Sequence, residues 1–199
     1  MVEEFKVQMD QLKDKGMYHG YWDCIHEVKG CLPESRKGAS MNLVGNEIFI
    51  FGGFSINTYQ DMKVFDIFSS RWREVETSTM RVIPEPRVSH TMVKYNNSLI
   101  LFGGSGAYMP NLQMMPSFND IWMFDTDRMN WDKLEGSGIP PKKRMGHVAS
   151  VLGCLMLVHG GYNCESKLTL DDFTLFDAEE HKWIKTRILM NGKEIVSDT

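Results

Sequence analysis

Paired aspartates, the residue type that serves many enzymes as general acid or base, recur at fixed spacings in this chain of 199 residues. The motif is Asp-x4-Asp-x5-Trp, and its three copies are Asp61, Asp66 and Trp72; Asp120, Asp125 and Trp131; and Asp172, Asp177 and Trp183. A single active site would break such a repetition. We therefore interpret the repeated carboxylates as architecture rather than as catalytic groups.

Histidines are the other residues suited to acid-base chemistry. His90 and His147 each follow an arginine by three residues, but the first copy has Ala39 at that position. No role that all the copies share can require an imidazole, so packing at the start of an innermost strand is the better interpretation. His159 replaces a phenylalanine of the other copies and is most simply a core substitution. We predict no catalytic residue and no enzyme activity.

The repeat also contains glycine pairs and arginines. The pairs are Gly52-Gly53, Gly103-Gly104 and Gly160-Gly161, and sixteen positions before each first glycine stand Arg36, Arg87 and Arg144. Only the stretch between the second glycine and the first aspartate varies in length. Insertions are therefore confined to one loop in each repeat.

Each copy has the pattern of four short antiparallel strands. Turn dipeptides that tolerate positive φ follow the arginines at one fixed distance, at Gly45-Asn46, Asn96-Asn97 and Gly153-Cys154. They predict hairpins whose second strands are Glu47 to Phe51, Ser98 to Phe102 and Leu155 to His159. A third strand lies between the paired aspartates, the second aspartate opens a tight turn, and the tryptophan begins a fourth strand.

Four antiparallel strands in a period of about 50 residues are typical of a propeller blade. The chain resembles the kelch family in its three glycine pairs, in Asp66, Asp125 and Asp177, and in Trp72, Trp131 and Trp183. The resemblance covers residues 36–183. It implies an all-β fold of kelch-type β-propeller blades, each a four-stranded antiparallel sheet, but it does not fix a function, because kelch propellers serve many partners.

The resemblance also predicts an incomplete, open propeller. Trp22, Gly30, Pro33 and Arg36 reproduce the outer strand and exit loop that follow Trp131, whereas closed rings have about four to eight blades. The expected organisation is a short helical or flexible segment at 1–16, an outer strand of a partial blade at 17–35, blades at 36–83, 84–140 and 141–187, and a C-terminal tail at 188–199. Additional blades or neighbouring subunits are expected to cover the open flanks.

The composition predicts a protein without nucleic-acid or membrane partners. The net charge is −4 with mixed signs, and no apolar run approaches a membrane span. The first sixteen residues carry neither a signal-peptide core nor a transit pattern, so we expect a cytoplasmic location, with cytoskeletal or ciliary association as a further possibility. The cysteines lack the paired spacing of a zinc site; we expect free thiols and no cofactor at Cys24, Cys31, Cys154 and Cys164.

The variable loops are predicted to share one face of the array, because alternate connections of an up-and-down sheet lie on the same side. These loops are Phe54 to Gln60, Ser105 to Asn119 and Tyr162 to Leu170. The second is long and Met-rich, and its candidate partner-binding residues are Tyr108, Met109, Met114, Met115 and Phe118. The alternative is that these side chains fold back over the blade as a lid.

Arg36, Arg87 and Arg144 begin the innermost strands on the same side, and they allow two interpretations. As a ring of guanidinium groups they would suit an acidic peptide, because the planar fork binds carboxylates bidentately. As structural residues they would be buried between blades, bonded to a neighbouring carbonyl or to a repeated aspartate.

The leading functional interpretation is a non-catalytic scaffold or adaptor whose loop-rich face binds a protein partner. One alternative is a structural subunit of a cytoskeletal or ciliary assembly, whose neighbours would cover the flanks. Another is a fragment of a propeller enzyme or of a metal-dependent kelch protein whose missing blades carry the site.

Overall fold

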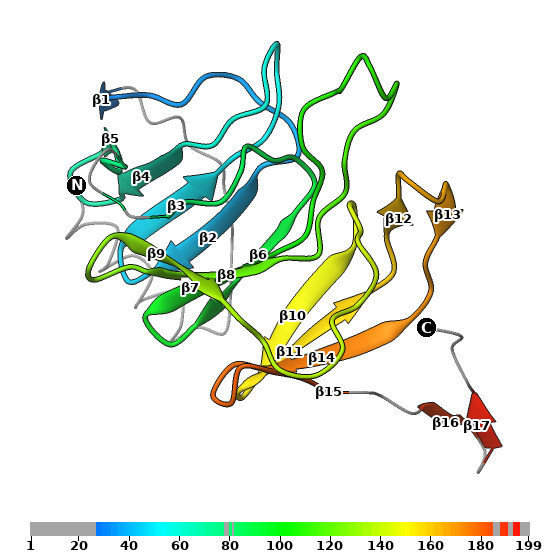
Figure 1. Ribbon diagram of the computed structural model, residues 1–199. Coiled ribbons are helices and arrows are strands. Elements are labelled where there is room, and N and C mark those ends of the chain that lie inside the picture. The colour runs from blue at the N-terminus through cyan, green and yellow to red at the C-terminus, as the bar shows by residue number, and fades with distance from the viewer. Residues whose placement is uncertain (1–26, 78–79, 81, 185–187, 191–192, 196–199) are drawn as a thin grey trace, which may run out of the picture.

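Three antiparallel sheets lie side by side in the computed structural model, which describes residues 27–77, 80, 82–184, 188–190 and 193–195 (Figure 1). That part of the chain contains strands of two to five residues and no helix. It accordingly offers no helix with the length and apolar character to span a membrane.

Each sheet contains a blade of four antiparallel strands whose order in the sheet is their order in the sequence, and the first sheet has a fifth, parallel strand at its edge. The first blade consists of β2 (Ser40–Val44), β3 (Glu47–Phe51), β4 (Met62–Asp66) and β5 (Arg71–Glu74). The second consists of β6 (Thr91–Tyr95), β7 (Ser98–Phe102), β8 (Ile121–Asp125) and β9 (Asn130–Leu134). The third consists of β10 (Val148–Leu152), β11 (Leu155–His159), β14 (Phe173–Asp177) and β15 (Lys182–Ile184). The kelch-type blade expected from the sequence is confirmed.

Smaller elements flank the blades. Strand β1 (Lys29–Gly30) pairs in parallel with β5 of the first blade, and Ser137 bridges in parallel to Lys182 of the third blade in the same way. Strands β12 (Tyr162–Asn163) and β13 (Leu168–Thr169) form a small hairpin within the third variable loop. A last hairpin joins β16 (Ile188–Met190) to β17 (Lys193–Ile195), in the segment expected to be a tail.

The predicted blade boundaries stay predictions. The helical or flexible segment predicted at residues 1–16 and the strand predicted around Trp22 lie outside the described residues, as does Cys24.

Positive φ angles explain the turns at the start of each blade. The first hairpin residues, Gly45, Asn96 and Gly153, have φ values of 60°, 52° and 62°, in the left-handed region that Gly and Asn tolerate. The first glycine of each pair also has positive φ. At Gly52 a Cβ atom would lie 2.7 Å from the carbonyl oxygen of Arg87, so the close approach of the next blade requires glycine.

The hydrophobic core lies between the blades rather than within one of them. One cluster joins the first blade to the second and includes Phe49, Phe51, Leu101 and Trp131. A second cluster joins the second blade to the third. Ring centroids across these interfaces are 4.9 Å apart for Phe51 and Trp131 and 5.1 Å apart for Phe102 and Trp183. Each blade is therefore stabilised chiefly by its neighbour.

The array is open over the residues that the structure describes. Innermost strand β6 packs against β2 on one side and β10 on the other, and the outer flanks of the first and third blades carry apolar side chains in solvent. On the third blade these are Val148, Leu152 and Leu157, and on the first Met41 and Leu43. Three blades of this kind form an incomplete propeller.

Candidate interaction face

The three repeated arginines form the same set of contacts in every blade, here called the arginine clamp. In the second blade, Nη1 of Arg87 donates to the carbonyl of Gly103 at 2.9 Å, and the two terminal nitrogens donate to the two carboxylate oxygens of Asp120, each at 2.8 Å. Arg36 with Gly52 and Asp61, and Arg144 with Gly160 and Asp172, repeat this arrangement. The clamp ties the start of a blade to both ends of its variable loop.

The clamps are buried. The side chains of Arg87 and Arg144 are 0% exposed and that of Arg36 is 6% exposed. Burial alone would raise the pKa of Asp120, but the hydrogen bonds and charge of Arg87 prevail and lower it below its usual 3.8. Of the two interpretations of the arginines, the structure shows the internal one: their guanidinium groups bond to repeated aspartates and neighbouring carbonyls. Their assignment as partner-binding residues remains a prediction without a direct test.

The backbone of each clamp also joins neighbouring blades. The N–H of Gly53 donates to the carbonyl of Arg87 at 2.9 Å, and the N–H of Gly104 donates to the carbonyl of Arg144 at 2.8 Å. The second glycine of each pair in these blades is thereby fixed to the next blade.

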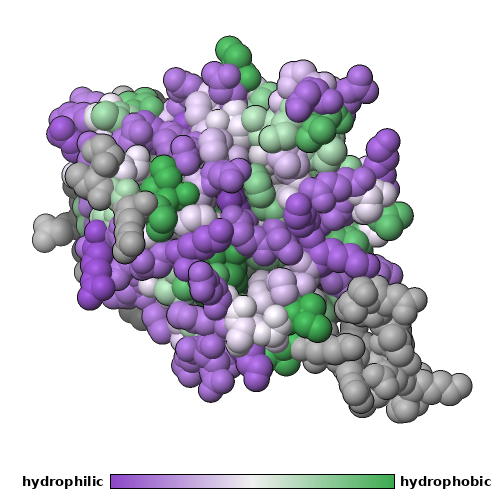
Figure 2. Space-filling view, viewed as in Figure 1, coloured by the Kyte–Doolittle hydropathy of each residue, from purple (hydrophilic) through white to green (hydrophobic). Residues whose placement is uncertain are grey.

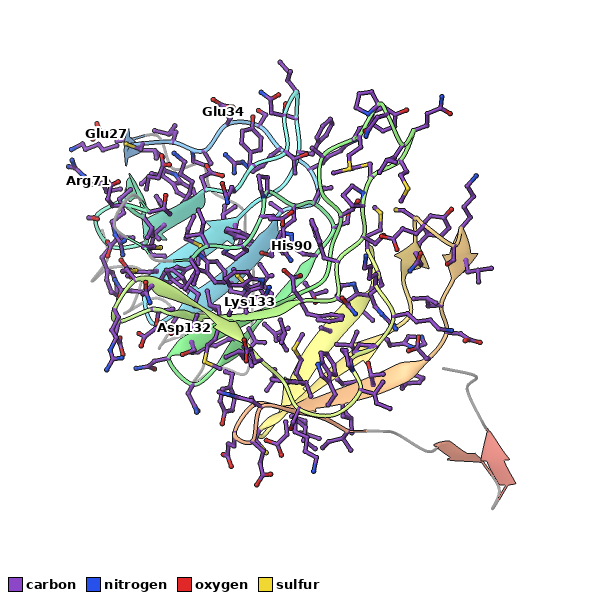
Figure 3. All side chains as sticks on the ribbon, viewed as in Figure 1. Glu27, Glu34, Arg71, His90, Asp132 and Lys133 are labelled. Carbon is purple, nitrogen blue, oxygen red and sulfur yellow. The ribbon has the colours of Figure 1, made fainter. Side chains whose placement is uncertain are left out.

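The repeated histidines are buried between blades, where the innermost strands meet, and Figure 3 labels His90. Nε2 of His90 is 2.8 Å from the hydroxyl of Ser40, and Nε2 of His147 is 2.8 Å from the hydroxyl of Thr91. Burial lowers the pKa of His90 to about 3 and that of His147 to about 4, with the charges of nearby arginines acting in the same direction. Both imidazoles are therefore neutral at pH 7 and act as packing groups.

The second aspartate of each pair closes a tight turn at the opposite end of the blade. Asp66 accepts from the backbone N–H of Ser69, and Asp125 and Asp177 accept in the same way from the residues two and three positions on. The hydrogen bond from the backbone of Ser69 lowers the pKa of Asp66. The turn predicted from the sequence is present, and it accounts for these carboxylates.

The three variable loops extend on one side of the array, and we call this side the loop face (Figure 1). The second and third loops touch, because the backbone N–H of Cys164 donates to the hydroxyl of Ser117 at 3.1 Å. The shared face predicted for these loops is therefore observed.

The candidate residues of the second loop divide into an exposed tip and an anchored base. Tyr108 and Met109 are 58% and 41% exposed, whereas Met114 and Met115 are half-buried. Phe118 is also half-buried, with the guanidinium carbon of Arg87 4.5 Å from its ring centroid. Tyr59 covers Arg36 in the same way at 4.1 Å. The tip is thus available to a partner, while Phe118 covers the clamp.

Further apolar side chains on the loop face were missed by the sequence reasoning. Ile56 of the first loop is 90% exposed and Ile139, in the connection between the second and third blades, is 84% exposed. Leu112 and Leu168 are also exposed. The face of the molecule that Figure 2 shows is mostly hydrophilic, with hydrophobic residues in small separate groups. The signal available in the sequence was the presence of bulky apolar residues in segments without strand periodicity.

The described residues hold no cluster of three or more histidine, cysteine or acidic side chains that suits a metal ion. Cys31, Cys154 and Cys164 are free thiols, and the sulfur of Cys164 lies 3.3 Å from that of Met145.

Comparison with known proteins gives one matching family model, described as the KLHDC2/KLHL20/DRC7 Kelch-repeats domain, over residues 17–195. The chain is 31% identical to human host cell factor 1 over 177 residues, and this match covers 79% of the chain and 8% of that protein. It is 29% identical over 161 residues to rat Kelch domain-containing protein 3, covering 75% of this chain and 40% of that protein. A Dictyostelium discoideum Rho GTPase-activating protein, gacHH, is 31% identical over 130 residues, which are 65% of this chain and 8% of that protein. The chain therefore spans less than half of each of these relatives.

Proposed function

The chain belongs to the kelch-repeat family, and from that premise we propose that it is a non-catalytic interaction scaffold or adaptor whose loop face binds a protein partner. The observation that carries the proposal is that each of the three loops of one face exposes bulky apolar side chains to solvent. Ile56, Tyr108, Leu112 and Leu168 all project there from a rigid sheet scaffold. Long loops held by such a scaffold are common recognition surfaces.

Contact with a partner would bury these side chains and gain hydrophobic free energy. Aromatic and methionine residues are enriched at protein interfaces, and the exposed tip of the second loop offers Tyr108 and Met109. The buried histidines and turn-forming aspartates have structural roles, which agrees with a function in binding rather than catalysis.

The test compares two faces of the same molecule. A loop-face variant, Tyr108→Ala with Met109→Ala, is used as bait beside the wild type and a matched variant, Ile67→Ala with Phe68→Ala. Ile67 and Phe68 are 42% and 65% exposed in the turn at the opposite end of the first blade. We expect quantitative mass spectrometry to find proteins retained by the wild type and the matched variant but lost by the loop-face variant. Equal loss from both variants, or from neither, would contradict the proposal.

We also propose that additional blades or neighbouring subunits cover the open flanks. Leu152 on the third blade is 84% exposed and Met41 on the first is 69% exposed, although the corresponding surfaces inside the array are buried. The native mass of the purified chain tests this. A soluble monomer that binds no apolar dye would contradict it.

A structural subunit of a cytoskeletal or ciliary assembly is the second candidate, supported by these same flanks. In that case flank variants such as Leu152→Asp would abolish incorporation into the assembly and loop-face variants would not. The opposite pattern would favour the adaptor.

A further inference from the structure

The residue two positions after each clamp aspartate differs among the blades. In the second blade it is Trp122, whose indole N–H donates to Oδ2 of Asp120 at 2.6 Å. In the first blade it is Lys63, whose ammonium lies 4.0 Å from Oδ2 of Asp61. Both side chains are largely buried. The second blade therefore adds a second nitrogen donor to the carboxylate that the arginine already binds. The first blade adds only a second cation at ion-pair distance, because Lys63 donates its hydrogen bond to Glu74 at 2.6 Å.

In the third blade the same position is Thr174, whose side chain is too short to repeat this contact. Among the described residues, only Arg144 donates to the carboxylate of Asp172, at 2.9 Å and 2.7 Å. The hydroxyl oxygen of Thr174 is buried without a hydrogen-bond partner. Asp172 thus keeps free the acceptor position on Oδ2 that an indole occupies on Asp120.

A cavity of about 720 Å³, here called the Thr174 cavity, lies beside this carboxylate. Its lining includes Asp172, Thr174, Trp183, Gly138, Pro141 and Leu168. Cavities of about 300–1,000 Å³ are typical of ligand sites, so this one is large enough for an aromatic side chain and the adjoining backbone. Leu168 belongs to the third variable loop and Gly138 to the connection between the second and third blades. The cavity therefore adjoins the loop face.

The second blade shows how an indole is held in the equivalent place. Trp122 meets Trp131 edge-on, with ring centroids 6.5 Å apart and an interplanar angle of 87°. Trp183 is the counterpart of Trp131 and lines the Thr174 cavity. An entering indole would find the same aromatic wall and the same carboxylate acceptor. Edge-on aromatic pairs and charge-assisted hydrogen bonds both favour that pose.

We propose that the Thr174 cavity binds a tryptophan side chain of a protein partner, which donates its indole N–H to Oδ2 of Asp172. This inference rests on the proposed function, since it names one contact of the partner with the loop face. Tryptophan is among the residues that most often anchor protein interfaces in pockets.

The test titrates the ¹⁵N-labelled chain with N-acetyl-tryptophanamide and follows its NMR spectrum. We expect saturable shifts at Gly138, Thr174 and Trp183. The N1-methyl analogue lacks the donor, so we expect its affinity to be lower by about tenfold, the equivalent of one hydrogen bond to a charged group. Absence of saturable shifts with the wild type, or equal affinity for the methylated analogue, would overturn the proposal.

A filling variant supplies the matched comparison. Thr174→Trp places the residue of the second blade in the third, and we expect it to abolish binding of N-acetyl-tryptophanamide. Ile67→Trp adds a tryptophan far from the cavity and should leave the affinity unchanged. If Thr174→Trp fails to fold, Thr174→Leu can replace it. Leucine adds less volume than tryptophan but still narrows the cavity, so we expect weaker binding. Undiminished binding by a folded filling variant would contradict the proposal.

The result also separates this inference from the proposed function. Retention of a partner by the loop face without any binding of the indole probe would reject the Thr174 cavity and leave the scaffold function standing. Binding of the probe by a chain that retains no partner would leave the Thr174 cavity standing as an indole site and reject the scaffold function.

Discussion

The second and third blades follow the same backbone path and carry the same arginine clamp, yet they differ where a blade meets its neighbour. Arg87 and Arg144 contact a glycine carbonyl and an aspartate at distances that agree within 0.1 Å. Across the blade interface, Trp122 is replaced by Thr174 and Thr91 by Val148. The contacts of the clamp, which lie within one blade, are thus repeated. The residues at the blade surfaces differ with the neighbour that each surface faces.

Both replacements in the third blade are informative. Thr91 bonds to His147 of the following blade, whereas Val148 is 63% exposed and has no described histidine beside it. Thr174 leaves a cavity where Trp122 fills the space. The comparison teaches that the third blade departs from the repeat at its flank and beside its clamp, the two places where we propose contacts with other molecules.

Loss of a clamp should have the largest effect in both blades. Arg87→Ala and Arg144→Ala each leave a largely buried carboxylate without its cation, and Asp120 alone keeps a donor, the indole of Trp122. We expect each to lower the free energy of unfolding by about 3–5 kcal/mol in urea denaturation. Arg128→Ala is the control, because Arg128 is 85% exposed and its ion pair spans 3.8 Å; we expect a change below about 1 kcal/mol. An effect of either clamp variant as small as that of Arg128→Ala would break the comparison.

Exchange of the residues beside the clamp should have the next largest effect. Trp122→Thr removes a buried indole and leaves a cavity, so we expect a loss of about 3 kcal/mol in the free energy of unfolding. The variant should also give the second blade a binding site for N-acetyl-tryptophanamide. Thermal unfolding and NMR titration measure the two effects. A stable variant that gained no site would show that Thr174 alone does not make the cavity.

Acid should weaken the interfaces that contain histidine. His90 and His147 titrate near 6.5 in the unfolded chain, but their pKa values in the folded protein are about 3 and about 4. The unfolded chain therefore binds more protons below pH 6.5, and stability falls as the pH is lowered from 6.5 toward 4. Each histidine contributes about 1.4 kcal/mol per pH unit in that window.

Urea denaturation between pH 7 and pH 5 measures this slope, in a range where most carboxylates remain charged. His147→Ala should be less stable than the wild type and should show a shallower dependence on pH. An unchanged slope would mean that His147 is not the group that titrates.

The smallest effect concerns the hydroxyl groups across the interface. Thr91→Val leaves a buried imidazole nitrogen of His147 without a partner, so we expect a loss of about 1–2 kcal/mol in the free energy of unfolding. Val148→Thr places the threonine of the second blade on the open flank, where no described histidine is available to form a hydrogen bond with it. That variant should change stability by less than about 0.5 kcal/mol. Similar values for the two variants would remove the distinction between interior and flank.

Repetition explains why so much of the fold could be predicted from one sequence. The spacing of Asp66 and Trp72, repeated twice more, fixes the turn and the outer strand, and Gly45, Asn96 and Gly153 fix the first hairpin of each blade. These signals are local, and three copies in register exclude coincidence. The strand positions predicted from these signals therefore agree closely with the observed strands.

The site was less predictable because its residues meet only after the blades pack. The sequence left two roles open for Arg36, Arg87 and Arg144, since a guanidinium group serves an internal carboxylate or a partner equally well. The importance of Thr174 could not be read from its identity. It depends on the space that Trp122 fills in the neighbouring blade, and that comparison requires the register of the strands.

Over the residues that the structure describes, the sequence by itself determined the number of blades, their strands, their turns and the loop face, because these depend on short spacings and on backbone conformations that few residues adopt. Only the tertiary structure decided that the clamps are internal, that His90 and His147 join blades, and that the third blade keeps a cavity beside Asp172. These properties depend on packing between segments far apart in the chain, such as those of Thr91 and His147, which are 56 residues apart, and packing leaves no pattern in the local sequence.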